Sequence, residues 1–207
     1  MSKKLLTAVV MGSALVAAAP AMAYEAGDII VRVGAANANT DTSDKVLGGA
    51  LDLDVSNDTS VGITGTYMLT DQVGIELLAA TPFNHEINSG VAGQIGKTKH
   101  LPPTLSVQWF PMGSGSKVQP YVGAGINYTT FFSEEATGAL AGSKLKLSDS
   151  VGFAVQAGID IALNDNWLLN AAVWKVDLET DVKLDGTKIG KVEIDPTVYM
   201  ISVGYKF

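Results

Sequence analysis

The 207-residue chain contains no cysteine. A disulfide scaffold is therefore excluded, and backbone hydrogen bonds and packing must hold the fold together. After residue 23 the chain also lacks any run of about 18 apolar residues that could form a membrane helix. Basic residues are few, because 14 Lys and Arg stand against 21 Asp and Glu and give a formal net charge of −7. An acidic chain of this kind argues against nucleic acid as a partner.

The N-terminal residues have the pattern of a secretory signal peptide. Two lysines precede an apolar run, residues 5–19, and a small-residue cleavage site follows at residues 21–23. The run is short for a transmembrane anchor, and no stop-transfer charges follow it. We therefore expect residues 1–23 to be cleaved and residues 24–207 to form one domain that begins with Tyr24.

Apolar residues of the mature chain alternate with polar residues over eight segments. Such a period of two indicates strands with one apolar and one polar face. The segments are residues 28–37, 59–69, 73–83, 98–110, 119–132, 150–163, 167–178 and 197–207. Most are long enough to cross a bilayer as tilted strands of about 9–11 residues. Alternation alone fits a transmembrane β-barrel and also a periplasmic β-sandwich or lipocalin-like barrel.

The connections alternate between short and long. Short ones, rich in turn-forming residues, are 70–72, 111–118 and 164–166, and long ones are 38–58, 84–97, 133–149 and 179–196. Short turns on the periplasmic side and long loops outside the cell are typical of outer-membrane barrels.

The C-terminal segment favours the membrane. Tyr199, Ile201, Val203, Tyr205 and Phe207 share one face, which would supply a lipid-facing band and part of an aromatic girdle. Its aromatic end, Tyr205 and Phe207, looks like the terminal signal that the barrel-assembly machinery recognises. We therefore predict an all-β fold, an eight-stranded antiparallel transmembrane β-barrel in the outer membrane of a Gram-negative cell, with the lipid bilayer and that machinery as partners.

Polar residues at the inward positions are predicted to close the periplasmic half of the barrel. If the apolar faces contact lipid, the alternate positions point into the lumen. The charged and amide residues at such positions are Arg32, Glu76, Gln108, Gln156, Asp160, Asn170 and Lys206, and all lie near short turns or a chain end. We expect them to form a polar plug in which Arg32 and Lys206 neutralise Glu76 and Asp160.

Toward the long loops the inward positions become apolar. They are Leu78, Ala80, Pro82, Pro102 and Phe131, and they predict an apolar upper lumen above the plug. An eight-stranded barrel is nearly filled by its own side chains, so a wide aqueous pore is excluded. Each of these residues could also serve only to pack the interior.

In the seventh segment the apolar phase changes. Trp167, Leu169 and Val173 have one parity, whereas Trp174 and Val176 have the other. A β-bulge near Lys175 would explain the change, and so would a strand that leaves the membrane at this point.

Four longer stretches carry a family resemblance. They are "AATPFNH" (residues 79–85), "LPPTLSVQWFPMG" (101–113), "PYVGAGINYTTFF" (120–132) and "DPTVYMISVGYKF" (195–207). Together they resemble the outer membrane protein W family, OmpW, which includes AlkL and OprG. The resemblance implies an eight-stranded barrel with a narrow hydrophobic channel that opens sideways through the wall and passes small hydrophobic molecules into the membrane. It implies no enzymatic activity and no cofactor.

The prolines of the third and fourth segments suggest where such an opening would lie. A hairpin with its apex near Ala92 and Gly93 places Pro82 opposite Pro103, with Pro102 beside it. Proline has no N–H to donate to the ladder, so Pro82, Pro102 and Pro103 are candidates for a lateral gate. Alternatively, they only mark the outer rim, where the wall has already left the lipid.

The same register places the two histidines, His85 and His100, opposite each other at a hydrated rim. With Glu86 and Ser89 nearby they could form a metal pair or the base of a lipid hydrolase. We predict neither a catalytic nor a metal site, because further nitrogen or sulfur ligands and a constrained nucleophile motif are missing from the sequence. Passive uptake of a small hydrophobic solute is the preferred function. The alternative is an adhesive or structural barrel that acts through its loops, which would have a uniformly polar lumen and no need of prolines in the wall.

Overall fold

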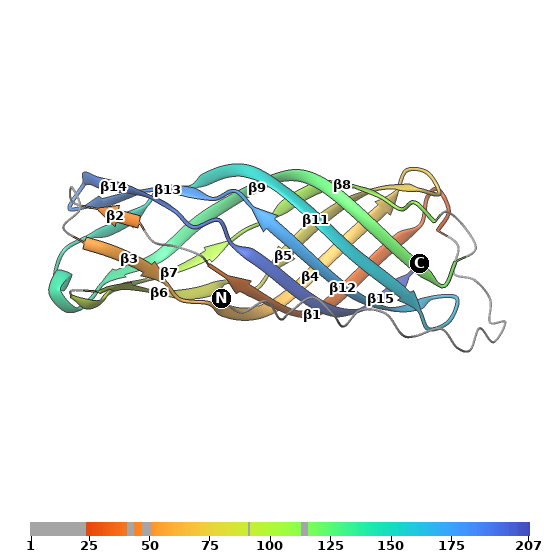
Figure 1. The fold of residues 1–207 in the computed structure, drawn as a ribbon, viewed down its shortest axis with the longest axis horizontal. Coiled ribbons are helices and arrows are strands. Elements are labelled where there is room, and N and C mark those ends of the chain that lie inside the picture. Colours follow the sequence, from red (N-terminus) through yellow and green to blue (C-terminus); the bar gives the residue numbers. More distant parts are fainter. Residues whose placement is uncertain (1–23, 41–43, 47–50, 91, 113–115) are drawn as a thin grey trace, which may run out of the picture.

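The computed structural model describes residues 24–40, 44–46, 51–90, 92–112 and 116–207. The predicted signal peptide lies outside these residues. Eight antiparallel strands pair in a closed ring (Figure 1), in the order β1 (Ile29–Asn39), β4 (Asp58–Met68), β5 (Val73–Ala80), β8 (Thr104–Trp109), β9 (Val118–Ala136), β11 (Ser150–Ala162), β12 (Trp167–Val176) and β15 (Thr197–Lys206), which returns to β1. The predicted eight-stranded barrel is confirmed. None of the helices in the described part of the chain has the length and apolar composition to cross a membrane.

Segments that the sequence analysis assigned to long loops contain strands. These strands lengthen the wall beyond the barrel (Figure 1). They are β2 (Asp44–Val46), β3 (Leu51–Val55), β6 (Phe83–Ser89), β7 (Gly93–Leu101), β10 (Leu145–Leu147), β13 (Glu179–Leu184) and β14 (Thr187–Glu193), and a 3-10 turn lies at Gly138–Leu140. The long connections are confirmed, but the strands within them were not predicted, because the outward residues of these strands are polar. Asn84 and Glu86 of β6 face outward and are exposed, so this hairpin lacks the lipid-facing pattern by which the other strands were recognised.

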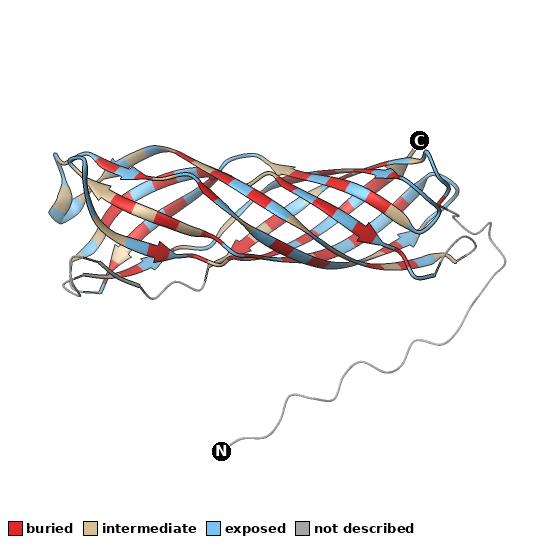
Figure 2. Ribbon diagram, turned by 90° about the horizontal axis from the view of Figure 1, so that it is seen from above, coloured by how far each residue is buried: buried red, intermediate tan, exposed pale blue. Residues whose placement is uncertain are grey.

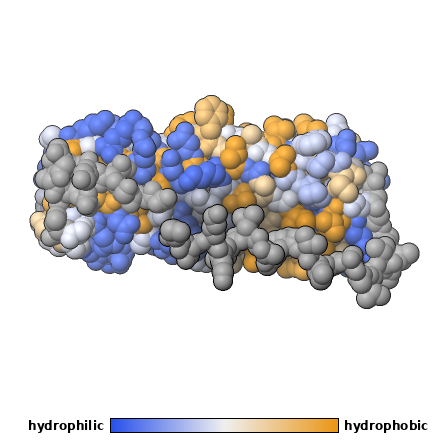
Figure 3. Space-filling view, in the orientation of Figure 1, coloured by the Kyte–Doolittle hydropathy of each residue, from blue (hydrophilic) through white to orange (hydrophobic). Residues whose placement is uncertain are grey.

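The barrel strands bury one face and expose the other, as Figure 2 shows by the alternating colours along each ribbon. Apolar side chains on the outer face remain exposed, among them Ile63, Leu77, Leu105, Val107, Val122, Ile126, Phe153, Val155, Ile201 and Val203. Figure 3 shows these apolar surfaces over the barrel strands, while the end formed by β6, β13 and β14 is mostly hydrophilic. The apolar band marks the part of the wall that lies in lipid.

The change of phase in the seventh barrel strand marks the upper limit of this band. Residues of β12 and β15 pair without a shift from Trp167 opposite Tyr205 to Lys175 opposite Thr197, so a bulge is not the cause. Trp174 is 1% exposed and points inward, whereas Lys175 points outward. The apolar side chains therefore move from the lipid side to the lumen side where the strand leaves the membrane.

The hairpin of the third and fourth segments has a register two residues away from the predicted one. Phe83, not His85, lies opposite His100, and His85 lies opposite Thr98. The pairing of Pro82 with Pro103 was therefore wrong. The difference comes from the turn, because Ser89 pairs with Gly93 and the strands therefore meet earlier in the chain than the predicted apex at Ala92 and Gly93. The one register shift, between Ile87 and Asn88, reduces the difference by one residue.

Candidate functional site

A buried ion pair forms the floor of the lumen. The guanidinium group of Arg32 donates from Nε to Asp160 Oδ1 at 3.0 Å and from Nη2 to Asp160 Oδ2 at 2.5 Å. Its Nη1 donates to Thr66 Oγ1 at 2.9 Å and lies 3.5 Å from Glu76 Oε2. The side chains of Arg32, Glu76 and Asp160 are each 1% exposed. Two parallel hydrogen bonds between a guanidinium and a carboxylate give the strongest and most directional pairing available to these groups.

Amide and hydroxyl groups continue this network across the barrel. Gln108 accepts a hydrogen bond from Thr66 at 3.1 Å and donates to Gln156 at 3.3 Å, and Asn170 donates to Asp160 at 2.8 Å. Four residues predicted for the polar plug, Arg32, Glu76, Gln108 and Asp160, thus lie together in one connected layer. Its donors and acceptors bridge strands on both sides of the lumen.

Two predictions about the plug need correction or addition. Lys206 forms its ion pair with Asp28 at 3.5 Å, near the ends of β15 and β1, whereas the ion pairs of Glu76 and Asp160 are with Arg32. Tyr24 was not predicted, yet it is fully buried and its hydroxyl donates to Asp160 at 2.6 Å. The sequence signal for Tyr24 was weak, because it precedes the first strand and belongs to no alternating segment.

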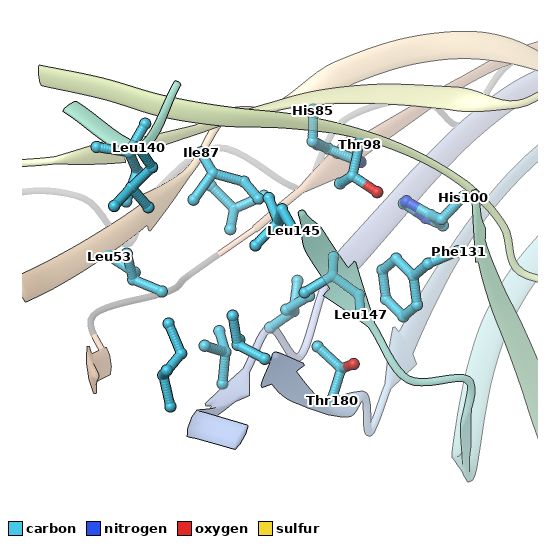
Figure 4. Close-up of a pocket in the computed structure, with 16 residues that line it drawn as sticks. Leu53, His85, Ile87, Thr98, His100, Phe131, Leu140, Leu145, Leu147 and Thr180 are labelled. Carbon is cyan, nitrogen blue, oxygen red and sulfur yellow. The ribbon is translucent and has the colours of Figure 1, made fainter. Parts of the chain in front are cut away.

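An apolar chamber lies in the outer extension of the wall. It has an empty volume of about 660 Å³, which includes space open to solvent. Its lining comes from β3, β6, β7, β9, β10, β13 and β14 and is aliphatic except for Phe131, His85, His100, Thr98 and Thr180. Figure 4 places His85, Thr98 and His100 together on one side of this upper chamber, with Leu53 and Leu140 on the other.

A second apolar cavity, of about 480 Å³ including open space, lies deeper in the barrel. The predicted upper-lumen residues divide between the two spaces, since Leu78 and Ala80 line this lower cavity and Phe131 lines the upper chamber. Pro102 also lines the lower cavity, but Pro82 is exposed on the outer surface, so its predicted inward position was wrong. His100 lines both spaces and marks the boundary between them.

Aromatic rings surround this boundary. The imidazoles of His85 and His100 stack with centroids 4.8 Å apart and planes 10° from parallel, and Phe83 stacks on His100 at 5.4 Å. His85 and His100 are 3% and 5% exposed, so the prediction of a hydrated rim was wrong. Within the described residues no group of three His, Asp or Glu side chains could hold a metal ion.

The ladder between the third and fourth strands of the wall is interrupted beside the lower cavity. Pairing between β5 and β8 ends with Leu78 opposite Thr104, and pairing between β6 and β7 resumes with Phe83 opposite His100. Between these points the two strands do not pair with each other. We call this stretch, residues 79–82 on one strand and 101–103 on the other, the seam. All three predicted gate prolines fall within it. Outward apolar Leu77 lies below the seam and outward polar Asn84 lies above it, so the seam is at the upper border of the lipid-facing band.

Each edge of the seam is held by its other neighbour. On one side the Thr81 N–H donates to Val61 of β4 at 2.8 Å. On the other side the Asn127 amide of β9 donates to the carbonyl oxygens of Pro102 and Pro103 at 3.2 and 3.3 Å. Pro102 and Pro103 therefore remain attached to β9, while the ladder toward β5 is missing. Asn127 was not predicted, although its polar side chain at an inward position above the plug could have indicated it.

The family model, two similar relatives and a solved structure agree on the family of this chain. Residues 25–207 match the OmpW family. The chain is similar to outer membrane protein W of Vibrio cholerae, with 48% identity over 94% of this chain and 95% of the relative, and to outer membrane protein W of Escherichia coli, with 44% identity over 99% of this chain and 100% of the relative. The crystal structure of the outer membrane protein OprG from Pseudomonas aeruginosa superposes with a TM-score of 0.81 at 42% identity, covering 90% of this chain and 99% of that one.

Proposed function

This chain belongs to the OmpW family of outer-membrane barrels, and from that premise we propose that it admits small hydrophobic molecules passively, through the upper chamber and out through the seam into the membrane. The observation that carries the proposal is the order of the spaces along the lumen. Two apolar cavities meet at His100, the lower one lies behind the seam, and a buried polar layer lies beneath it.

The polar floor supports a sideways exit. A solute that continued toward the periplasm would have to separate Arg32 from Asp160, and breaking a buried ion pair costs about 3–5 kcal/mol. At the seam, in contrast, the route is not closed by ladder hydrogen bonds. An apolar solute in the lower cavity therefore meets a lower barrier toward lipid than toward the periplasm, and its net transfer from water to lipid is favourable.

Replacing the seam prolines tests this route. In the variant Pro82→Thr, Pro102→Val, Pro103→Val, each position regains an N–H. Residues 82 and 102 can then pair across the seam, whereas residue 103 faces β9, where its carbonyl accepts from the Tyr128 N–H at 2.9 Å. We expect the barrel to be at least as stable as the original, since ladder bonds are gained, and uptake of naphthalene by cells to fall. The comparison requires equal amounts of folded protein, judged by heat-modifiable gel migration.

Pro120→Val is the matched control, because Pro120 lies in the continuous ladder of β9 and β11, opposite Ile159. It should leave uptake unchanged. Undiminished uptake by the folded triple variant would contradict a lateral exit. Equal uptake by cells with and without the protein would favour the alternative function, an adhesive or structural barrel.

A further inference from the structure

His85 presents a single hydrogen-bond acceptor to the upper chamber. It lies on β6 and is 3% exposed. Its Nδ1 is in hydrogen-bond contact with the carbonyl oxygen of Ser56. A carbonyl only accepts, so Nδ1 must carry the proton, and in the neutral ring Nε2 then carries a lone pair.

This Nε2 has no hydrogen-bond partner in the described structure. Most of the chamber lining is aliphatic, and the hydroxyl protons of its two threonines are donated to backbone carbonyls rather than to Nε2. Thr180 donates to the Ser148 carbonyl at 2.6 Å, and Thr98 to the Lys99 carbonyl at 3.4 Å. A buried polar atom without a partner is uncommon in folded proteins and requires a specific explanation.

The imidazole is held in place for such a contact. The stacked ring of His100 covers one side of His85, and the Ser56 carbonyl fixes its tautomer. Burial keeps it uncharged by lowering the pKa of His85, which the hydrogen bond with Ser56 and the charge of Asp58 oppose only in part. Burial likewise lowers the pKa of His100 to about 3. Both imidazoles are therefore neutral at physiological pH, so they place no charge in the chamber that would disfavour a neutral solute.

We propose that the upper chamber is selective for amphiphilic molecules that have an apolar body and one hydrogen-bond donor, such as an alcohol, a phenol or a protonated carboxylic acid, with the donor bound to Nε2 of His85. This inference rests on the proposed function and narrows its class of solute. A hydrocarbon fills the same chamber but leaves Nε2 unpaired. A site that offers a buried hydrogen-bonding group discriminates against ligands that lack the complementary group.

A matched pair of ligands tests the selectivity. Binding of 2-naphthol and naphthalene is measured by equilibrium partition into lipid nanodiscs that contain the folded protein, after subtraction of partition into empty nanodiscs. The variant His85→Phe keeps an aromatic ring in the stack and removes the acceptor. We expect the ratio of 2-naphthol to naphthalene affinity to fall about tenfold in this variant, equivalent to about 1.4 kcal/mol.

Two further variants separate hydrogen bonding from packing. His85→Gln retains an acceptor oxygen and should restore part of the ratio. Phe131→Leu alters the chamber without touching an acceptor and should change both affinities by a similar factor. An unchanged ratio in His85→Phe, with naphthalene still bound, would overturn this inference and leave the proposed function intact. Absence of protein-dependent binding for both ligands would overturn the two together.

Discussion

At the scale of the single residue, Arg32 joins the carboxylates that form the polar floor of the lumen. It is the one arginine of the chain, and it binds Asp160 through two hydrogen bonds while lying close to Glu76. Arginine suits this position because its planar group donates several hydrogen bonds in fixed directions. Gly204 opposite Arg32 leaves the space that its side chain needs, since a Cβ there would come within 3.0 Å of Arg32 Cγ.

Removal of this guanidinium group should destabilise the barrel strongly. Arg32→Ala leaves Asp160 and Glu76 buried without a counter-charge, so we expect a loss of about 3–5 kcal/mol in the free energy of unfolding. Lys206→Ala is the control, because its pair with Asp28 is partly exposed, with both side chains at 18%, and should cost only about 0–1 kcal/mol. Urea midpoints of the folded proteins measure both. Equal and small losses would mean that the plug is hydrated.

Residue positions could be predicted from the sequence where a period of two was clear. Alternation in the barrel strands was enough to place Arg32, Glu76 and Asp160 inside. It gave no information on Tyr24, which lies outside every strand. It also did not predict the ion pair of Lys206 with Asp28, because a side chain at the end of a strand can reach several carboxylates. Both histidines were assigned to the correct hairpin but not to its interior, since the polar outward residues around them suggested a rim.

At the scale of the element, β15 closes the ring between β12 and β1. Its outward aromatic residues cluster at the C-terminus, where Tyr205 lies 5.1 Å from Trp167 and 4.7 Å from Phe207 between ring centroids. Phe207 is 70% exposed. Because this residue buries little surface within the barrel, its predicted role lies in recognition by the assembly machinery and in the membrane interface.

Substitution of the terminal aromatic residues should therefore lower the amount of folded protein. We expect Tyr205→Ser combined with Phe207→Ser to reduce the heat-modifiable, folded fraction in outer membranes several-fold, and Tyr199→Ser, on the same face of β15 but far from the terminus, to have a much smaller effect. Gel migration of unheated and heated samples measures the fraction. If the two variants fold equally well, the terminal residues are not an assembly signal.

The register of the β6–β7 hairpin could not be obtained from the sequence. A hairpin register depends on its turn and on any bulge. Here Ser89 already pairs with Gly93, so the turn comes before the predicted apex, and one further shift lies between Ile87 and Asn88. The prolines were nevertheless placed in the correct pair of strands. Proline lacks the N–H in any register, but the ladder that loses the bond depends on which neighbouring strand the residue faces.

At the scale of the whole molecule, function follows from the order of regions along the barrel axis. The upper chamber comes first, then the ring cluster at His100, the lower cavity behind the seam, and the polar floor. The change of lumen from polar to apolar coincides with the change of outer surface from apolar to polar, as Trp174 and Lys175 of β12 illustrate. The seam lies at this transition, and in the proposed function it is the place where a solute leaves the lumen for the lipid.

A reversible cross-link over the seam is the most direct test of this account. Thr81 and Leu101 lie on opposite edges of the seam, and the chain has no cysteine of its own, so Thr81→Cys with Leu101→Cys can be joined by a reducible bifunctional thiol reagent. Ile159→Cys with Ala171→Cys, neighbours in the continuous β11–β12 ladder, is the control. We predict that cross-linking abolishes naphthalene uptake only in the first variant and that reduction restores it. Full uptake after complete cross-linking of the seam would contradict the lateral exit.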